Sequence, residues 1–89
     1  MFRRNDMAKR RSRVDIVVAI LQIADKGAKK TQIVYGANLN FKFLNGYLDK
    51  LEKAGLIARD YENNGIIKTT EKGEKYLQHY VVFKDFGII

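Results

Sequence analysis

The residues of this chain that could do chemistry are few, and they suit binding better than catalysis. His79 is the only histidine and there is no cysteine, so neither a histidine-based metal cluster nor a thiolate site can be assembled. The acidic residues are scattered, and no phosphate-binding glycine loop is present. Lys42 and Asn45, by contrast, carry groups that can pair with base edges, lysine with guanine and asparagine with adenine. We therefore expect no enzyme, no cofactor and no metal, and no small-molecule ligand is evident from the sequence.

The segment that carries these two residues, FKFLNGYLDK, allows two interpretations. Asn45 and Gly46 between apolar residues are typical of a two-residue β-hairpin. At about 100° per residue, however, the apolar residues of 41–54 gather on one side of a helix and the polar residues on the other. Two leucines also break the alternation that a strand requires. We therefore predict a helix that is capped by Asn40 and presents Lys42, Asn45 and Gly46 outward.

The other elements are predicted from caps, turns and apolar periodicity. Ser12 followed by Asp15 fits a capping box. Thr31 can cap a short second helix, and Thr70 can cap the last one. Asn38 suits the left-handed residue of a tight turn. The predicted order is a helix over about 13–26, a helix over 32–37, a helix over 41–54, a β-hairpin over 56–70 and a last helix over about 71–83.

The formal net charge of +7 is concentrated at the N-terminus. Residues 1–13 hold six basic groups and one acid, whereas the remainder holds eleven basic and nine acidic groups. Basic arms of this kind bind nucleic-acid phosphates, although they also act as solubilising tails. The apolar run at 14–24 is too short to cross a bilayer, so we expect no membrane partner. We divide the chain into a basic, flexible arm over 1–12 and a folded domain with a C-terminal helix and apolar tail over 13–89.

A short helix, a tight turn and a longer helix with a separate polar face form the helix-turn-helix pattern. About residues 9–80 of the chain resemble the archaeal winged helix-turn-helix proteins, which include small dimeric chromatin-associated DNA binders. The resemblance is carried by RRSRVDIVVAILQIADKGAKKTQIVYGANLNF, LNGYLDKLEKAGLI and KTTEKGEKYL, of which YGANLNF and TTEKG are the most telling. It implies an α+β, mainly α fold, with a three-helix core, a β-hairpin wing over 56–70 and a C-terminal helix.

The resemblance also implies that the third helix lies in the major groove, with the arm and the wing on the backbone or in the minor groove. Asp49 and Glu52 on the third helix repel phosphate, but Asp49 can pair with Lys53 four residues further on. Together with the basic and polar residues nearby, the predicted DNA-binding residues are Arg10, Arg11, Lys29, Lys30, Thr31, Asn40, Lys42, Asn45, Gly46, Lys50, Lys53, Arg59, Asn63, Asn64 and Lys68.

The chromatin-associated relatives extend their last helix into a long antiparallel coiled coil, whereas this chain holds only a few residues after the predicted helix. The end of the chain nevertheless offers more apolar surface than one short helix needs. We therefore predict a homodimer whose interface comprises Tyr76, Leu77, Tyr80, Val81, Phe83, Phe86, Ile88 and Ile89.

These observations favour a duplex DNA-binding protein, a transcriptional regulator of the cytoplasm associated with the nucleoid. Binding energy is expected to come largely from phosphate contacts, and base discrimination from Lys42 and Asn45. Two alternatives remain open at this point. Winged helices also serve as protein-interaction and assembly modules, and a sequence-tolerant binder could organise chromatin instead of regulating single genes.

Overall fold

The computed structural model describes residues 12–85, and the side chains only as far as residue 80. Several predicted site residues lie outside the described part, namely Arg10, Arg11, Phe86, Ile88 and Ile89. The described elements, in chain order, are α2 (Arg13–Ile23), α3 (Lys30–Gly36), α4 (Phe41–Lys53), β1 (Ile57–Asp60), the 3-10 helix η1 (Tyr61–Asn63), β2 (Ile66–Thr69) and α5 (Glu71–Asp85).

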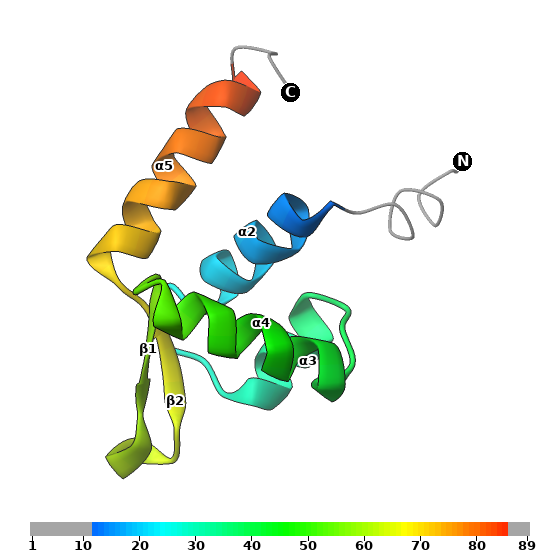
Figure 1. The fold of residues 1–89 in the computed structure, drawn as a ribbon, viewed down its shortest axis with the longest axis vertical. Coiled ribbons are helices and arrows are strands. Elements are labelled where there is room, and N and C mark those ends of the chain that lie inside the picture. The colour runs from blue at the N-terminus through cyan, green and yellow to red at the C-terminus, as the bar shows by residue number, and fades with distance from the viewer. Residues whose placement is uncertain (1–11, 86–89) are drawn as a thin grey trace.

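Figure 1 shows how these elements are arranged. Helices α2, α3 and α4 lie together, the β1–β2 hairpin extends from one end of α4, and α5 runs away from the hairpin in the opposite direction. Helix α2 packs against α3, α5 and β2, while α4 packs against α3 and β1. The order of helix, helix, helix, hairpin and helix that the sequence predicts is therefore confirmed.

The start of α2 is held by the predicted capping box. The Ser12 hydroxyl accepts a hydrogen bond from the Asp15 N–H at 3.1 Å, and the Asp15 carboxylate accepts one from the Ser12 N–H at 3.2 Å. The helix ends at Ile23, earlier than predicted, and the chain then turns through Gly27 at φ +97°. Glycine adopts this left-handed conformation without the steric cost that a side chain adds.

The second helix begins earlier than predicted. Lys29, and not Thr31, is the N-cap residue of α3, and the Gln32 side-chain oxygen accepts from the Lys29 N–H at 2.8 Å. Because Gln32 satisfies this backbone donor from within the first turn, Thr31 lies inside the helix. The tight turn after α3 is as predicted, since Asn38 is left-handed at φ 57° and Leu39 packs half-buried against the core.

Both ends of α4 are closed by local hydrogen bonds. The Asn40 side-chain oxygen accepts a backbone N–H of the first turn at 2.8 Å. At the other end Gly55 is left-handed at φ +80°, and the Leu56 N–H donates back to the last turn at 2.9 Å, which completes a Schellman motif. Asn45 and Gly46 therefore lie inside a helix, and the hairpin interpretation of this segment is excluded.

The hairpin has an inner and an outer face. Strands β1 and β2 pair antiparallel, with Ile57 opposite Thr69 and Arg59 opposite Ile67. Because strand residues alternate between faces, these four residues share the inner face that packs on the helices. Ile67 also exchanges two backbone hydrogen bonds of 2.9 Å with Ala28, in the turn after α2. The sequence did not predict this additional strand pairing.

The start of α5 ties the hairpin to the end of α4. The Thr70 hydroxyl caps α5 by accepting from the Gly73 N–H at 3.1 Å. The Lys72 ammonium donates to the C-cap carbonyl of α4 at 2.8 Å, where a cation is favourable at the negative end of a helix. A Cβ atom on Gly73 would collide with the Leu56 carbonyl oxygen and approach Thr69 Cγ2 to 2.5 Å. This close packing therefore requires a glycine at position 73.

The core lies between the three helices and the inner face of the hairpin. Its largest fully buried side chains are Ile20, Leu21, Ile33, Leu44, Leu48 and Ile67. Phe41 and Phe43 depart from the helical-wheel prediction, because they are 46% and 62% exposed. Phe43 lies at the margin of the apolar side of α4, where an open hollow separates α4 from the start of α2. The leucines of α4 are thus hidden, but its two phenylalanine rings are not.

Candidate nucleic-acid interface

One side of α4 is turned away from the rest of the chain. We call it the outward strip and define it as Lys42, Asn45, Gly46, Asp49 and Lys53, all of which are exposed. A Cβ atom placed on Gly46 has nothing within 4 Å, so no described part of the chain covers this strip at its centre. The strip begins in the first turn of α4, where free backbone N–H groups and the helix dipole favour negative charge. It therefore combines hydrogen-bonding side chains with an electropositive helix end.

The acidic side chains of α4 are compensated by an arginine from the hairpin. Arg59 Nη2 lies 3.1 Å from Asp49 Oδ1, and its Nε lies 3.3 Å from Glu52 Oε1. The Arg59 side chain is only 14% exposed, because it faces inward from β1 toward α4, whereas that of Asp49 is 71% exposed. The pairing of Asp49 with Lys53 that the sequence predicts is replaced by this pairing across elements. Arg59 offsets part of the negative charge of these two acids and does not itself project outward.

The two cations predicted on the hairpin lie on opposite faces. Lys68 pairs in register with Ala58, so it occupies the outer face, and it is exposed. At the tip, η1 leads into Asn64, which is left-handed at φ 58°. Asn63 and Asn64 are both exposed there, as the sequence predicts for a wing tip. The hairpin thus offers its tip amides and Lys68 to the surroundings, but not Arg59.

The start of α3 presents a second group of predicted contacts. Lys29 and Thr31 are exposed, and Lys30 between them is half-buried. They lie at the N-terminal end of a helix, where backbone N–H groups also favour phosphate. On α4 itself, Lys50 is exposed on the flank next to the outward strip, and the Asn40 side chain is exposed while its oxygen serves as the N-cap.

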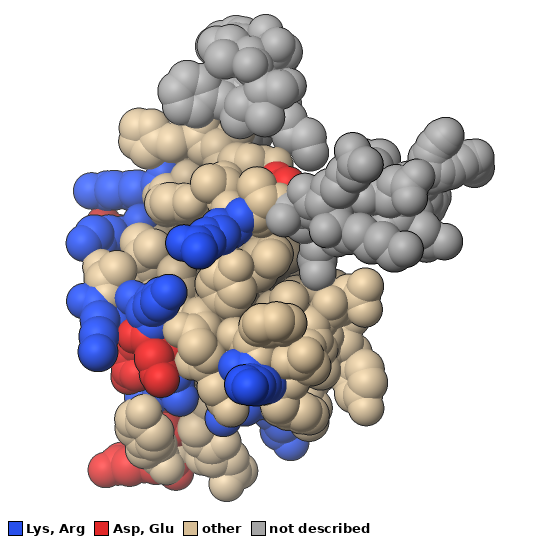
Figure 2. All heavy atoms as spheres, turned by 45° about the vertical axis from the view of Figure 1, so that its right-hand side comes forward, with Lys and Arg blue, Asp and Glu red and all other residues tan. Residues whose placement is uncertain are grey.

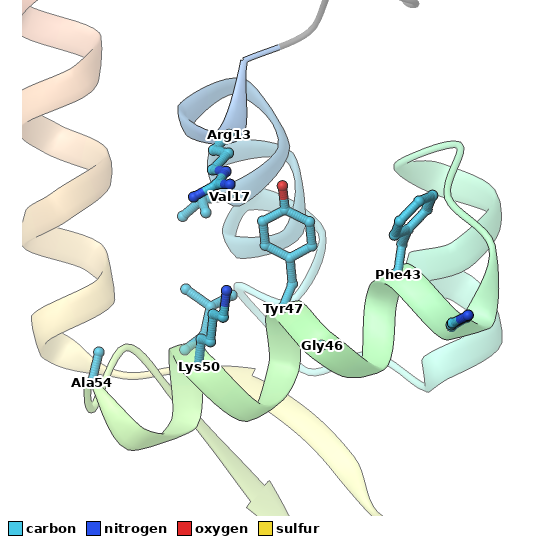
Figure 3. A pocket seen from close by; sticks show the side chains of 9 residues that line it. Arg13, Val17, Phe43, Gly46, Tyr47, Lys50 and Ala54 are labelled. Atoms are coloured by element: carbon cyan, nitrogen blue, oxygen red, sulfur yellow. The ribbon is translucent and has the colours of Figure 1, made fainter.

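A hollow on the α2 side of α4 brings together residues that sequence reasoning missed. Arg13 and Val17 extend from α2 toward Tyr47 and Lys50 on α4, and Phe43 lies at the far end (Figure 3). Arg13 and Tyr47 were not predicted as site residues, because only the folded arrangement of α2 against α4 brings them together. One signal was available, since the helical wheel places Phe43, Tyr47 and Lys50 along the same margin of the third helix.

Among the charged side chains seen in Figure 2, basic ones are more prominent than acidic ones. Lysines and arginines lie along the left edge and at the centre of this face, while acidic side chains form a small group between them and another at the lower edge. Within the described residues, no helix has the length and apolar character needed to span a membrane. The same residues contain no group of three or more histidine, aspartate or glutamate side chains that could hold a metal ion.

The predicted dimer residues are partly used within the chain. Tyr76 and Leu77 are half-buried and pack against the core. The Tyr80 hydroxyl donates to Asp15 Oδ1 at 3.3 Å, which links α5 to α2. Val81 and Phe83 lie on α5, but their side chains fall outside the described part, as does the rest of the predicted interface.

Asp25, in the turn after α2, and Glu74, in the first turn of α5, form an acidic pair. A side-chain hydrogen bond with Asp25 raises the pKa of Glu74, and desolvation by burial and the negative charge of Asp25 raise it further. The positive charge of Lys68 acts in the opposite direction and lowers the pKa of Glu74. The net effect is that the pKa of Glu74 lies above its ordinary value.

Comparison with known proteins agrees with this architecture. The chain matches the model of the winged helix-turn-helix family over residues 10–87. It is 34% identical over 77 residues to an uncharacterized protein of Methanocaldococcus jannaschii, and this alignment covers 84% of the present chain and 76% of the relative.

Among solved structures, the fold is similar to the crystal structure of Sso10a-2, a DNA-binding protein from Sulfolobus solfataricus. The TM-score is 0.77 and the sequence identity 31%, with 85% of the present chain and 81% of the neighbour covered. These similarities confirm the predicted fold class and the resemblance to archaeal winged helix-turn-helix proteins.

Proposed function

The chain belongs to the winged helix-turn-helix family, and on that premise we propose that it binds duplex DNA through the outward strip of α4. The observation that carries the proposal is the exposure of Lys42, Asn45 and Gly46 on a helix whose leucines, on the opposite side, are buried. An α-helix fits the major groove, where asparagine can pair with adenine and lysine with guanine. A related structure, that of Sso10a-2, is described as a DNA-binding protein.

Charge compensation supports this orientation of α4. Two carboxylates on a helix that enters the major groove would repel the phosphates on either side. Arg59 donates a hydrogen bond to Asp49 and lies at ion-pair distance from Glu52, so the helix can approach DNA with part of their negative charge offset. In this proposal Arg59 acts through the two acids and is not a direct DNA contact.

The phosphate contacts are assigned to the elements on either side of α4. Lys29, Lys30 and Thr31 at the start of α3 lie where a helix-turn-helix meets the backbone. Asn63 and Asn64 at the tip of the hairpin reach a neighbouring stretch of duplex. The basic residues of the arm, Arg10 and Arg11 among them, add further phosphate contacts. Lys53 and Lys50 on α4 complete the set.

The finer role that we propose is transcriptional regulation by a homodimer inside the cell. Two copies related by a two-fold axis would place two α4 helices on neighbouring major-groove faces. The dimer is assigned to the end of α5 and the residues after it, because Tyr76 and Leu77 are already engaged in the core of their own chain. Sedimentation at micromolar concentration should therefore give twice the 10.3 kDa of one chain, and a species of single mass would reject the dimer.

Titration of a fluorescent duplex of roughly 20–30 base pairs at about 50 and 200 mM salt tests DNA binding directly. We expect saturable binding that weakens steeply with salt. Replacing Lys42 and Lys53 by glutamine should lower the affinity and reduce the salt slope by about 1 for each lysine. The matched control replaces Lys26 and Lys75, which are exposed outside the proposed interface, and should leave both quantities nearly unchanged.

Asn45→Ala separates sequence-specific from sequence-tolerant binding. If Asn45 reads a base, the variant should lose roughly 1–3 kcal/mol of preference for a selected site and keep its affinity for random DNA. An absence of any salt-sensitive, saturable binding by the full chain would reject DNA as the partner, and would favour the protein-interaction module instead.

A further inference from the structure

The hollow between α2 and α4 is open to the surface and has the volume of a small-molecule site. Its volume is about 570 Å³, and Figure 3 shows side chains from both helices pointing into it. Pockets of roughly 300–1,000 Å³ commonly hold small ligands. The apolar part of the lining comes from Val17 on α2 and from Phe43, Tyr47 and Leu51 on α4.

The charge at the hollow selects an anion. Arg13 reaches it from α2, and Lys42 and Lys50 reach it from α4. Within the described residues, the ion pairs involve Arg59, and these three cations take part in none of them. Three cations that pair with no acid among the described residues, beside an apolar surface, therefore attract a ligand that is both negatively charged and hydrophobic.

The exposed ring of Phe43, at the far end of the hollow, favours a flat ligand. Phe43 is 62% exposed, although its type and its place beside Tyr47 favour burial. Aromatic rings gain most from an offset-stacked or edge-to-face partner. Gly46, between the two rings along α4, has no side chain, and no atom of the described residues lies within 4 Å of its Cβ position, so residues 12–85 leave the hollow open there. A flat ring can thus enter and cover Phe43.

We propose that this hollow binds a small aromatic anion, a flat ring system that carries a carboxylate, sulfonate or phosphate group. The ring packs against Phe43 and Tyr47, and Arg13 and Lys50 hold the anionic group. One consequence rests on the proposed function. Because Lys42 and Gly46 belong both to the lining of the hollow and to the outward strip, a bound ligand releases the duplex.

Calorimetric titration of the full chain with 1-naphthoate, without DNA, tests the site itself. We expect saturable binding with one ligand per chain. Phe43→Ala and Lys50→Gln should each weaken the affinity for 1-naphthoate by about tenfold or more, equivalent to roughly 1.4 kcal/mol. The unmodified chain should bind the uncharged analogue 1-naphthylmethanol more weakly than 1-naphthoate by the same factor. Phe43 and Lys50 are exposed, so both variants should keep the fold.

The matched controls are Phe41→Ala and Lys75→Gln, which remove the same side chains outside the hollow and should change the affinity by less than about twofold. The absence of saturable binding, or an equal loss in Phe41→Ala, would overturn the site. Adenosine monophosphate, titrated in the same way, distinguishes a nucleotide from an aromatic carboxylate, because the tighter binder identifies the ligand class.

Adding 1-naphthoate to the preformed DNA complex tests the regulatory consequence. Release of the duplex from the unmodified chain but not from Phe43→Ala supports it, and simultaneous binding of both ligands overturns it. The two proposals fail separately. A chain that binds 1-naphthoate but no DNA refutes the proposed function alone, and a chain that binds DNA but no 1-naphthoate refutes the hollow alone.

Discussion

Gly46 has opposite effects on stability and on binding, and one substitution separates them. Glycine inside a helix costs about 1 kcal/mol relative to a good helix former, and no described atom lies within 4 Å of the Cβ position. We therefore predict that Gly46→Leu raises the unfolding free energy by about 0.5–1 kcal/mol. If α4 enters the major groove, the same variant should bind duplex DNA more weakly, by about tenfold, because its side chain keeps the helix away from the bases. Denaturant unfolding and DNA titration measure the two effects, and unchanged DNA affinity would contradict this role of Gly46.

Arg59 should act on DNA binding through the two acids that it holds. Arg59→Gln leaves Asp49 and Glu52 with their full charge, so we predict a several-fold loss of DNA affinity together with a loss of about 1 kcal/mol of stability. Adding Asp49→Asn and Glu52→Gln to this variant should restore the affinity, which a direct contact from Arg59 to DNA does not explain. Failure of the triple variant to recover would assign Arg59 to the DNA contact itself. Anisotropy titration and thermal unfolding provide both measurements.

Single residues were predictable where the cause is local. The role of Asn40 could be recognised because its side chain accepts a hydrogen bond from the backbone N–H only three residues further on. That of Asn38 could be recognised because only a few residue types adopt the left-handed conformation. The pairing of Arg59 with the acids of α4 could not be predicted, because these partners lie on another element and the inward direction of Arg59 depends on the strand register. The exposure of Phe43 depends likewise on how far α2 covers α4, which periodicity along α4 does not determine.

The elements themselves follow largely from the sequence, since caps and glycines mark where most of them begin or end. Two differences have physical reasons. Helix α3 begins before Thr31 because the Gln32 side chain satisfies the Lys29 N–H. The pairing of Ala28 with Ile67 joins residues that are far apart in the chain. It is made by backbone N–H and C=O groups, and the types of the side chains do not determine which of these groups pair.

The junction of α5 with the turn after α2 should make stability depend on pH. The fold raises the pKa of Glu74 above its ordinary value. The stability that Glu74 contributes is therefore fully present when the pH is below its ordinary pKa, and it is lost as the pH rises through the raised pKa of the folded chain. Glu74→Gln removes the charge while its amide can still donate to Asp25. We therefore predict that the variant is more stable than the unmodified chain at neutral pH, and that the difference shrinks as the pH falls toward 4.

Thermal unfolding as a function of pH measures this difference. Glu71→Gln is the matched control, because it removes the same charge from the same turn of α5, where Glu71 is exposed. A stability gain that does not vary with pH, or an equal gain in the control, would show that the acidic pair is not its cause.

At the scale of the whole molecule, the uneven distribution of charge should separate affinity from specificity. Residues 1–13 hold six of the basic groups, whereas the rest of the chain is nearly balanced. Deleting residues 1–11 keeps the Ser12 cap of α2 and removes five basic groups. We predict that the shortened chain loses affinity for all sequences alike and shows a smaller salt slope, while its preference among sequences is retained. An unchanged affinity and salt slope would remove the arm from the interface.

The central claim is that duplex DNA meets the outward strip of α4, and NMR mapping of the backbone amides during a DNA titration tests it most directly. We expect the largest shift changes on residues 41–53, followed by the start of α3 and the hairpin tip at Asn63 and Asn64. Shift changes centred on α5, with the amides of α4 unmoved at saturating DNA, would contradict it.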